Sequence, residues 1–298
     1  MRYCLVSILF VLGCHGQVFA DELGTQEFSP ATLKLVRGQI NEVLVLGTPH
    51  LRDLPKSFES SHLSLLNERL ENWKPKAIAI EALSGLQCAY LRSYTQRYND
   101  TIKSYCKDTS AAKTATGLDI VEATAQAEQL LRKWPASPSA AQRRALASLF
   151  LAAGEPASAA VQWLRLPMEE RRVGDGLTEA LVETFTSLLV RRDETYLIAV
   201  PLAVKSGLER VYAMDDHTAD MPDVDERAYG EAIMRAWDNP FTMERKRMDE
   251  TLESHLDTPA GVLTMYRTYN ERSIAKLIFK SDFGAALEEP SKQHFGRG

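Results

Sequence analysis

The chain has 298 residues, of which 45% are hydrophobic and 25% charged, and its formal net charge is −5 at pH 7. This composition is typical of a globular protein that is long enough for one large core, or for one core with an inserted subdomain. Without a basic footprint, nucleic acid is excluded as a partner, and no interior stretch is apolar for long enough to span a bilayer.

The first twenty residues have the pattern of an export signal. A short basic lead at residues 1–3 precedes an apolar run at residues 4–12. Small residues at Val18 and Ala20 predict cleavage after Ala20, so residues 1–20 are a predicted signal peptide and the mature chain is expected in the periplasm or outside the cell. The alternative is a lipoprotein, because residues 11–14 approximate a lipidation motif that would leave a lipid anchor at Cys14.

A short buried strand is predicted at residues 43–46, where an apolar run precedes Gly47. Gly47 allows the backbone to turn and Pro49 stiffens it, so His50 follows the carboxyl end of the strand. Open α/β sheets bind their ligands at this edge. His50 is therefore a candidate metal ligand or proton carrier, and the equal alternative is that it only caps the turn.

An amphipathic helix is predicted at residues 63–73, and a second short strand at residues 77–81. Strand, helix and strand in this order are typical of a right-handed βαβ unit with parallel strands. Glu81 would then emerge at the same edge as His50, and a glutamate at the end of an apolar strand needs a partner. The alternative is that Glu81 begins a loop in solvent.

Cys88 and Cys106 are the two cysteines that follow the predicted leader and its lipidation motif. Export favours a disulfide between them, which would staple the helix or hairpin expected at residues 89–105. A bridge of this loop size contributes about 3 kcal/mol in the chain-entropy model. The alternative is two unpaired thiols.

A large helical insertion is predicted at about residues 86–190, where the pattern is persistently helical and rich in alanine. Amphipathic helices are expected at residues 118–134, 140–153 and 177–190. Residues 145–163 resemble one helical hairpin of the tetratricopeptide type. A single hairpin cannot bury its faces without neighbours, so we expect an insertion or lid rather than a solenoid.

A third short strand is predicted at residues 211–214, and it is followed by Asp215, Asp216 and His217. This repeats the order of an apolar strand and then ionisable side chains, although an Asp-rich turn with a surface histidine is the alternative. Asn239-Pro240 and Thr258-Pro259 each predict the start of a helix. The chain thus predicts an α/β fold, a short and mostly parallel sheet with flanking helices and the helical insertion, in a single domain at residues 21–298.

Gly47-Thr48-Pro49-His50 after a strand, followed by Ile78-Ala79-Ile80-Glu81, resembles the TraB/PrgY/GumN and Tiki superfamily, which has erythromycin esterase-like relatives. More specifically, the chain looks like an uncharacterised bacterial branch of that group, and residues 161–166, 191–194 and 210–218 share the likeness. The resemblance implies an α/β fold with a helical insertion and a hydrolytic site, associated in Tiki relatives with metal-dependent proteolysis. The second Gly-x-x-His of the family is missing, so we expect a chain that is incomplete at its C-terminus or has lost half of the site.

These patterns predict an exported metal-dependent hydrolase of the peptidase-like kind, with a small-molecule or peptide substrate. The predicted ligands of its Zn²⁺, Mn²⁺ or Co²⁺ ion are His50, Glu81, Asp215, Asp216 and His217. Such a metal lowers the pKa of a bound water molecule and so supplies a nucleophile at neutral pH.

Two further roles remain open within this prediction. Glu81, if it is not a ligand, would be the general base, and Arg192 would either stabilise an oxyanion or pair with Asp193. The rival prediction is a non-catalytic exported binding or interaction protein with a degenerate site, which the missing Gly-x-x-His favours. Phosphate-binding loops, dinucleotide fingerprints and the Gly-x-Ser-x-Gly elbow do not occur in the sequence, so kinases, Rossmann dehydrogenases and serine hydrolases of that type have no support.

Overall fold

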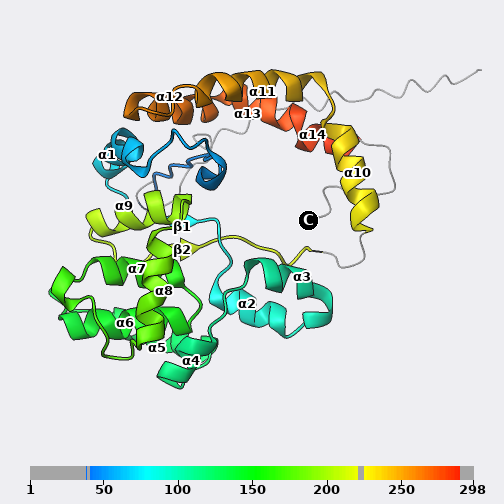
Figure 1. The fold of residues 1–298 in the computed structure, drawn as a ribbon. Helices are drawn as coiled ribbons and strands as arrows, with labels where there is room; N and C mark the ends of the chain where they lie inside the picture. The colour runs from blue at the N-terminus through cyan, green and yellow to red at the C-terminus, as the bar shows by residue number, and fades with distance from the viewer. Residues whose placement is uncertain (1–37, 39–40, 221–224, 289–298) are drawn as a thin grey trace, which may run out of the picture. The chain divides into compact units, whose positions relative to one another are not determined.

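The computed structural model describes residues 38, 41–220 and 225–288 (Figure 1). This part of the chain is predominantly helical and contains a two-stranded parallel sheet. Strand β1 (Ala79–Ile80) pairs with strand β2 (Tyr212–Ala213), with Ala79 opposite Tyr212 and Ile80 opposite Ala213. The prediction of a short parallel sheet with a large helical part is confirmed at this coarse level. The predicted leader and the candidate lipid anchor at Cys14 lie outside the described residues.

The strand predicted at residues 43–46 is not formed, so this prediction is wrong. The segment forms no β-structure in the described part of the chain, and Val43 and Val45 are exposed. A strand buried on both faces needs a paired neighbour, and β1 finds its partner in β2, which lies more than a hundred residues further along the chain. The chain divides at this point into two units, Met1–Val45 and Leu46–Gly298, and the elements and site described below belong to the second.

The two helices α2 (Gly85–Arg92) and α3 (Thr95–Tyr105) form a hairpin that is closed by a disulfide between Cys88 and Cys106, whose Cα atoms are 5.6 Å apart. Cys88 is buried with Leu83, Leu91 and Tyr98 in a small core. Gly85 lies against the backbone of Ala153, where an added Cβ would approach the carbonyl oxygen to 1.6 Å, so only glycine fits. The predicted disulfide and the stapled hairpin are confirmed.

The helical region that follows contains α4 (Ser110–Thr116), α5 (Ile120–Arg132), α6 (Ala140–Ala152), α7 (Pro156–Leu164) and α8 (Glu179–Leu189). Local signals set its boundaries, because Asp119 and Ser139 form capping boxes that begin α5 and α6, and Pro156 occupies the first turn of α7. A core centred on Phe150, with the rings of Trp163 and Phe185 stacked at 4.6 Å, packs these helices together. The predicted helices and the α6–α7 hairpin are confirmed.

The remaining helical elements are distributed along the second unit. They are the 3₁₀ turns η2 (Leu51–Asp53), η3 (Ser60–Leu63) and η4 (Met168–Glu170), helix α1 (Ser64–Trp73), the π-helical turn η5 (Thr195–Ala199), and helices α9 (Val200–Lys205), α10 (Glu226–Trp237), α11 (Pro240–Glu253), α12 (Pro259–Tyr269), α13 (Arg272–Ser281) and α14 (Phe283–Glu288). As predicted, α11 and α12 begin at Pro240 and Pro259. Within the described ranges, no helix combines the length and the apolar character needed to cross a membrane.

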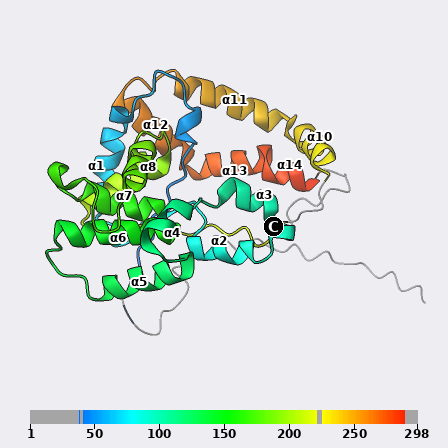
Figure 2. The ribbon, with the colours of Figure 1, turned by 60° about the horizontal axis from the view of Figure 1, so that its bottom comes forward.

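One hydrophobic core positions the candidate site. It brings together Leu51, Leu63, Ile198, Met265 and Tyr266 from segments that are far apart in the sequence. Helix α12 therefore packs beside α1, as both Figure 1 and Figure 2 show. The turn that carries His50 lies immediately before Leu51 in the sequence, and Leu51 is part of this core. The turn therefore lies close to the start of η5 and the end of α12, where Glu194 and Asn270 contact it.

Candidate functional site

The turn that precedes His50 is held by the side chain of Asn270, the residue that ends α12. The Gly47 amide donates to Asn270 Oδ1 at 2.7 Å, and Asn270 Nδ2 donates to the Gly47 carbonyl oxygen at 2.9 Å. Asn270 Nδ2 also donates to the carbonyl oxygen of Tyr266 at 2.8 Å, which fixes the amide on its own helix. An added Cβ at Gly47 would lie 3.3 Å from Asn270 Oδ1, so glycine allows this close approach.

His50 forms a hydrogen-bonded pair with Glu194, at the start of η5. Nδ1 of His50 lies 3.1 Å from Glu194 Oε1, and the Leu51 amide donates to Glu194 Oε2 at 3.4 Å. Because an ionised carboxylate only accepts hydrogen bonds, Nδ1 is the donor, which leaves the lone pair of the neutral ring on Nε2. The His50 side chain is 58% exposed, so the ring is fixed on one side and open to solvent on the other.

Tyr266 is buried in the hydrophobic core that also contains Leu51, the residue after His50. Its side chain is 1% exposed and its hydroxyl has no hydrogen-bond partner among the described residues. Burial and, to a lesser extent, the negative charge of Glu194 raise the pKa of Tyr266, so the phenol stays protonated. A buried hydroxyl without a partner is costly, and the charge of Glu194, the carboxylate that pairs with His50, acts on this one.

Arg192 clamps the loop after η2. Its Nη2 atom donates to the carbonyl oxygens of Leu54 at 3.0 Å and Pro55 at 2.7 Å, and its guanidinium lies 5.0 Å from the centroid of the Phe58 ring. The predicted alternative of a pair with Asp193 is wrong, because Asp193 binds the Nε atom of Arg191 at 3.1 Å. The predicted oxyanion role of Arg192 stays a prediction, and its Nη2 donors already serve the loop.

The three predicted residues after β2 form a second cluster. The ring of His217 lies between two carboxylates, with Nδ1 3.0 Å from Asp220 Oδ2 and Nε2 3.2 Å from Asp215 Oδ2. It also stacks on Tyr105 of α3, with a distance of 4.1 Å between the ring centroids. Both nitrogens of His217 are therefore engaged by its own segment, and the ring ties that segment to the disulfide-closed hairpin.

Asp216 lies at the edge of the same cluster. It accepts hydrogen bonds from the Thr218 amide at 2.8 Å and from Gln87 Nε2 on α2 at 2.7 Å. The bonds from Thr218, followed by the charge of His217 and the bond from Gln87, lower the pKa of Asp216. Asp216 therefore stays ionised and acts as an anchor between the segment after β2 and α2.

The predicted metal ligands are not brought together. Among the described residues, no group of three or more His, Cys, Asp and Glu side chains is arranged to hold a metal ion. His50 pairs with Glu194, His217 lies between Asp215 and Asp220, and Glu81 is exposed after β1. As placed here, these residues do not fit the predicted zinc, manganese or cobalt site, and the metal stays a prediction from the family resemblance.

The segment at residues 105–107 connects the two clusters. Tyr105 stacks on His217, while Lys107 lies close to the Arg191–Asp193 ion pair that immediately precedes Glu194. Burial and then the positive charge of Arg191 lower the pKa of Lys107, against the opposing effect of Asp193. The hairpin that the disulfide closes thus contacts His217, while the residue that follows it, Lys107, senses the charges of the Arg191–Asp193 ion pair.

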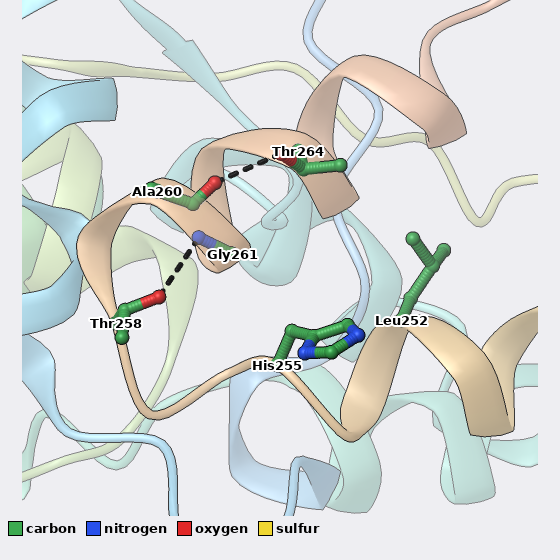
Figure 3. A pocket seen from close by; sticks show the side chains of 6 residues that line it. All are labelled: Leu252, His255, Thr258, Ala260, Gly261 and Thr264. Atoms are coloured by element: carbon green, nitrogen blue, oxygen red, sulfur yellow. Dashed lines mark hydrogen bonds between the residues drawn. The ribbon is translucent and has the colours of Figure 1, made fainter.

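A shallow hollow of about 290 Å³ lies at the junction of α11 and α12 (Figure 3). It is lined by Leu252, His255, Thr258, Ala260, Gly261 and Thr264. Two hydrogen bonds are drawn among these residues in Figure 3. The Gly261 amide donates to Thr258 Oγ1 at 3.1 Å, and Thr264 Oγ1 donates to the Ala260 carbonyl oxygen at 2.9 Å. Both stabilise the first turns of α12 itself. The hollow contains none of the predicted site residues, so we assign the site to the turn at His50.

Sequence reasoning missed Glu194, Tyr266 and Asn270 as members of the site. Glu194 stood in a charged run at a helix end, and Asn270 stood at the end of a helix, where such residues are common. Their contacts with the turn span 144 and 223 residues of sequence. A local pattern carries no signal for contacts of that range.

In comparisons with known proteins, no family model, no curated protein and no solved structure matches this chain. The resemblance to the TraB/PrgY/GumN and Tiki superfamily stays a prediction from the motifs at residues 47–50, 78–81, 161–166, 191–194 and 210–218 and from their order in the chain. Function has to be inferred from the geometry around His50.

Proposed function

We propose that the chain is an exported hydrolase in which His50, oriented by Glu194, acts as the general base. The observation that supports this role is the 3.1 Å contact between His50 Nδ1 and Glu194 Oε1 on a ring that is otherwise open to solvent. A carboxylate in this position fixes the tautomer of the imidazole and stabilises the imidazolium that forms when the ring takes a proton.

The proposed hydrolysis uses Nε2 of His50, the ring nitrogen that does not contact Glu194. Nε2 accepts a proton from a water molecule, and the water oxygen attacks the acyl carbon of an ester or amide in a small-molecule or peptide substrate. The same nitrogen then returns the proton to the leaving oxygen or nitrogen as the carbon–heteroatom bond breaks. Asn270 supports this chemistry because its bonds to Gly47 keep the turn, and hence the ring, in one place.

The family resemblance implies a divalent metal as well, with Glu81 as its base or ligand. The described side chains do not converge on such an ion, so no step of the proposed reaction passes through it. Chelation and metal addition are therefore included in the test as separate arms.

The experiment compares wild type with His50→Ala and Glu194→Gln on a panel of chromogenic esters and fluorogenic peptides. His255→Ala is the matched control, because His255 is also an exposed histidine but belongs to the hollow at α12. Loss of a general base lowers kcat/KM by about 10²- to 10⁴-fold. We expect this loss for His50→Ala, a smaller loss for Glu194→Gln and none for His255→Ala. Full activity of a folded His50→Ala protein would exclude the proposal.

The rival function is a non-catalytic exported binding protein, and one observation favours it. His217, Asp215, Asp220 and Thr101 form a closed hydrogen-bond network, with Thr101 Oγ1 2.5 Å from Asp220 Oδ2, as expected where strand-end polar residues serve structure. A folded wild-type protein that is inactive on the whole panel, with chelator, with added Zn²⁺, Mn²⁺ or Co²⁺ and with neither, would favour this rival.

A further inference from the structure

The hydroxyl of Tyr266 is a buried polar group that the proposed hydrolysis does not use. Tyr266 lies on α12, its side chain is 1% exposed, and among the described residues its hydroxyl has no hydrogen-bond partner. It belongs to the core of Leu51, Leu63 and Met265, where a phenylalanine would fill the same space without a polar atom. Because an unpaired buried hydroxyl costs free energy, its presence calls for a partner.

Tyr266 lies one helical turn before Asn270, the residue that holds the turn of the candidate site. Since four residues separate them, the two side chains leave the helix on the same side. The Asn270 amide binds both the Gly47 backbone and the carbonyl oxygen of Tyr266. The part of α12 that carries Tyr266 is therefore tied to the turn that precedes His50.

Glu194 is the carboxylate whose charge acts on this phenol. The charge adds to the effect of burial in raising the pKa of Tyr266, so the hydroxyl keeps its proton. The two residues also share a neighbour, because the Leu51 amide donates to Glu194 Oε2 and Leu51 belongs to the same core as Tyr266. A protonated phenol donates a hydrogen bond and an ionised carboxylate accepts one, so the two groups are complementary.

One oxygen of Glu194 can accept a further hydrogen bond. Oε1 lies 3.1 Å from His50 Nδ1, whereas Oε2 accepts from the Leu51 amide at 3.4 Å, which is long for a bond of this type. Each carboxylate oxygen can accept two hydrogen bonds. A stronger donor to Oε2 would hold the carboxylate, and with it the His50 ring, in one orientation.

We propose that Tyr266 is a positioning residue for the hydrolysis, and that its hydroxyl donates to the Glu194 carboxylate, directly or through one bridging water molecule. The proposal rests on the function proposed above. A donor on the carboxylate keeps Glu194 ionised, so the proton stays on Nδ1 of His50 and Nε2 remains free to act as the base.

The experiment compares Tyr266→Phe with wild type on the panel of esters and peptides. The substitution removes one hydroxyl and retains the ring, so the core stays filled. A misplaced catalytic group costs up to about 100-fold in rate, and we expect Tyr266→Phe to lower kcat by about 10- to 100-fold with KM within about twofold of wild type. Tyr269→Phe is the matched control, because it removes a hydroxyl from the same helix that donates to Asp249 at 2.9 Å. It should lower stability and leave kcat unchanged.

A second measurement does not depend on activity. In ¹⁵N NMR spectra of the histidine rings at one fixed pH, the His50 signals are assigned by their loss in His50→Ala. In wild type we expect the tautomer with the proton on Nδ1, and in Tyr266→Phe a mixture of both tautomers. The urea midpoint of Tyr266→Phe should also fall, because a hydrogen bond is lost. An idle hydroxyl predicts the opposite, since removing an unpaired buried group leaves the protein as stable as before or makes it more stable.

The outcomes separate this proposal from the hydrolase itself. An unchanged kcat and unchanged His50 signals in Tyr266→Phe, beside an inactive His50→Ala, would overturn the role of Tyr266 and leave the hydrolase in place. Full activity of His50→Ala would overturn the hydrolase, and the role of Tyr266 in it would fall as well. If wild type is inactive on the whole panel, the His50 signals decide whether Tyr266 acts on the His50–Glu194 pair.

Discussion

The two histidines that follow predicted strands, His50 and His217, illustrate opposite uses of one residue type. Only one ring nitrogen of His50, Nδ1, contacts a carboxylate, that of Glu194. In His217 both ring nitrogens contact carboxylates, the ring stacks on Tyr105, and the side chain is only 19% exposed. The same sequence pattern preceded both. What separates them is the number of ring atoms already engaged, and this decides which histidine is available to a substrate.

The largest expected effect tests this difference directly. His50→Ala should lower hydrolytic activity by about 10²- to 10⁴-fold and leave the free energy of unfolding nearly unchanged, because the side chain is exposed. His217→Ala should do the reverse, since it leaves Asp215 and Asp220 without their shared partner and costs about 1–3 kcal/mol of stability. Activity assays beside urea denaturation of both variants measure this. An inactive but fully stable His217→Ala protein would contradict the assignment.

The disulfide provides the next test, because it closes the hairpin that carries Tyr105 and Thr101 to the His217 cluster. Replacing both cysteines by serine should lower the free energy of unfolding by about 3 kcal/mol in the chain-entropy model. The His50–Glu194 pair lies on other elements, so activity of the folded variant at low temperature should remain within a fewfold of wild type. Thermal unfolding of wild type with and without reductant is the control, and it should reproduce the same loss.

The next prediction concerns Asn270, which holds the turn that precedes His50. Asn270→Ala removes two hydrogen bonds to Gly47, at about 0.5–1.5 kcal/mol each, and frees the turn that positions the ring. We expect activity to fall about tenfold, mainly through kcat, with a modest loss of stability. Asn270→Asp keeps an acceptor for the Gly47 amide and loses the donor, so it should be intermediate. An unchanged kcat in Asn270→Ala would show that the turn is held by other contacts.

The parts of the fold that the sequence predicted correctly depend on local signals. Capping residues such as Asp119 and Ser139 and the helix-opening Pro240 and Pro259 act within one turn, and the elements that they predict are present. The disulfide was predictable because the predicted export signal favours oxidised cysteines and only Cys88 and Cys106 follow the predicted leader and its lipidation motif, which leaves one pairing. The wrong strand at residues 43–46 shows the limit, since an apolar run forms a strand only where a partner edge is free.

The candidate site was predictable only in part for the same reason. His50 was found because a turn glycine and a proline mark it locally, whereas Glu194 and Asn270 reach it across 144 and 223 residues. Proximity of His50, Glu81 and His217 was inferred from a shared sheet edge that required the strand at residues 43–46. Without that strand, the argument that placed the three side chains together no longer applies.

The smallest expected effect is a pH dependence that belongs to the His217 cluster alone. Hydrogen bonds from Thr218, the charge of His217 and the bond from Gln87 lower the pKa of Asp216 below its usual 3.8. A depressed pKa stabilises the fold at pH values above 3.8, and this contribution is lost as the pH falls through the folded-state pKa. Asp216→Asn keeps an oxygen acceptor for the Thr218 amide but cannot ionise. Wild type should therefore be slightly more stable than Asp216→Asn in urea at pH 6, and the difference should vanish once the pH has fallen below the lowered pKa of Asp216. A difference that persists at low pH would mean that shape rather than charge anchors this residue, and the cluster around His217 would then owe its stability to packing on Tyr105.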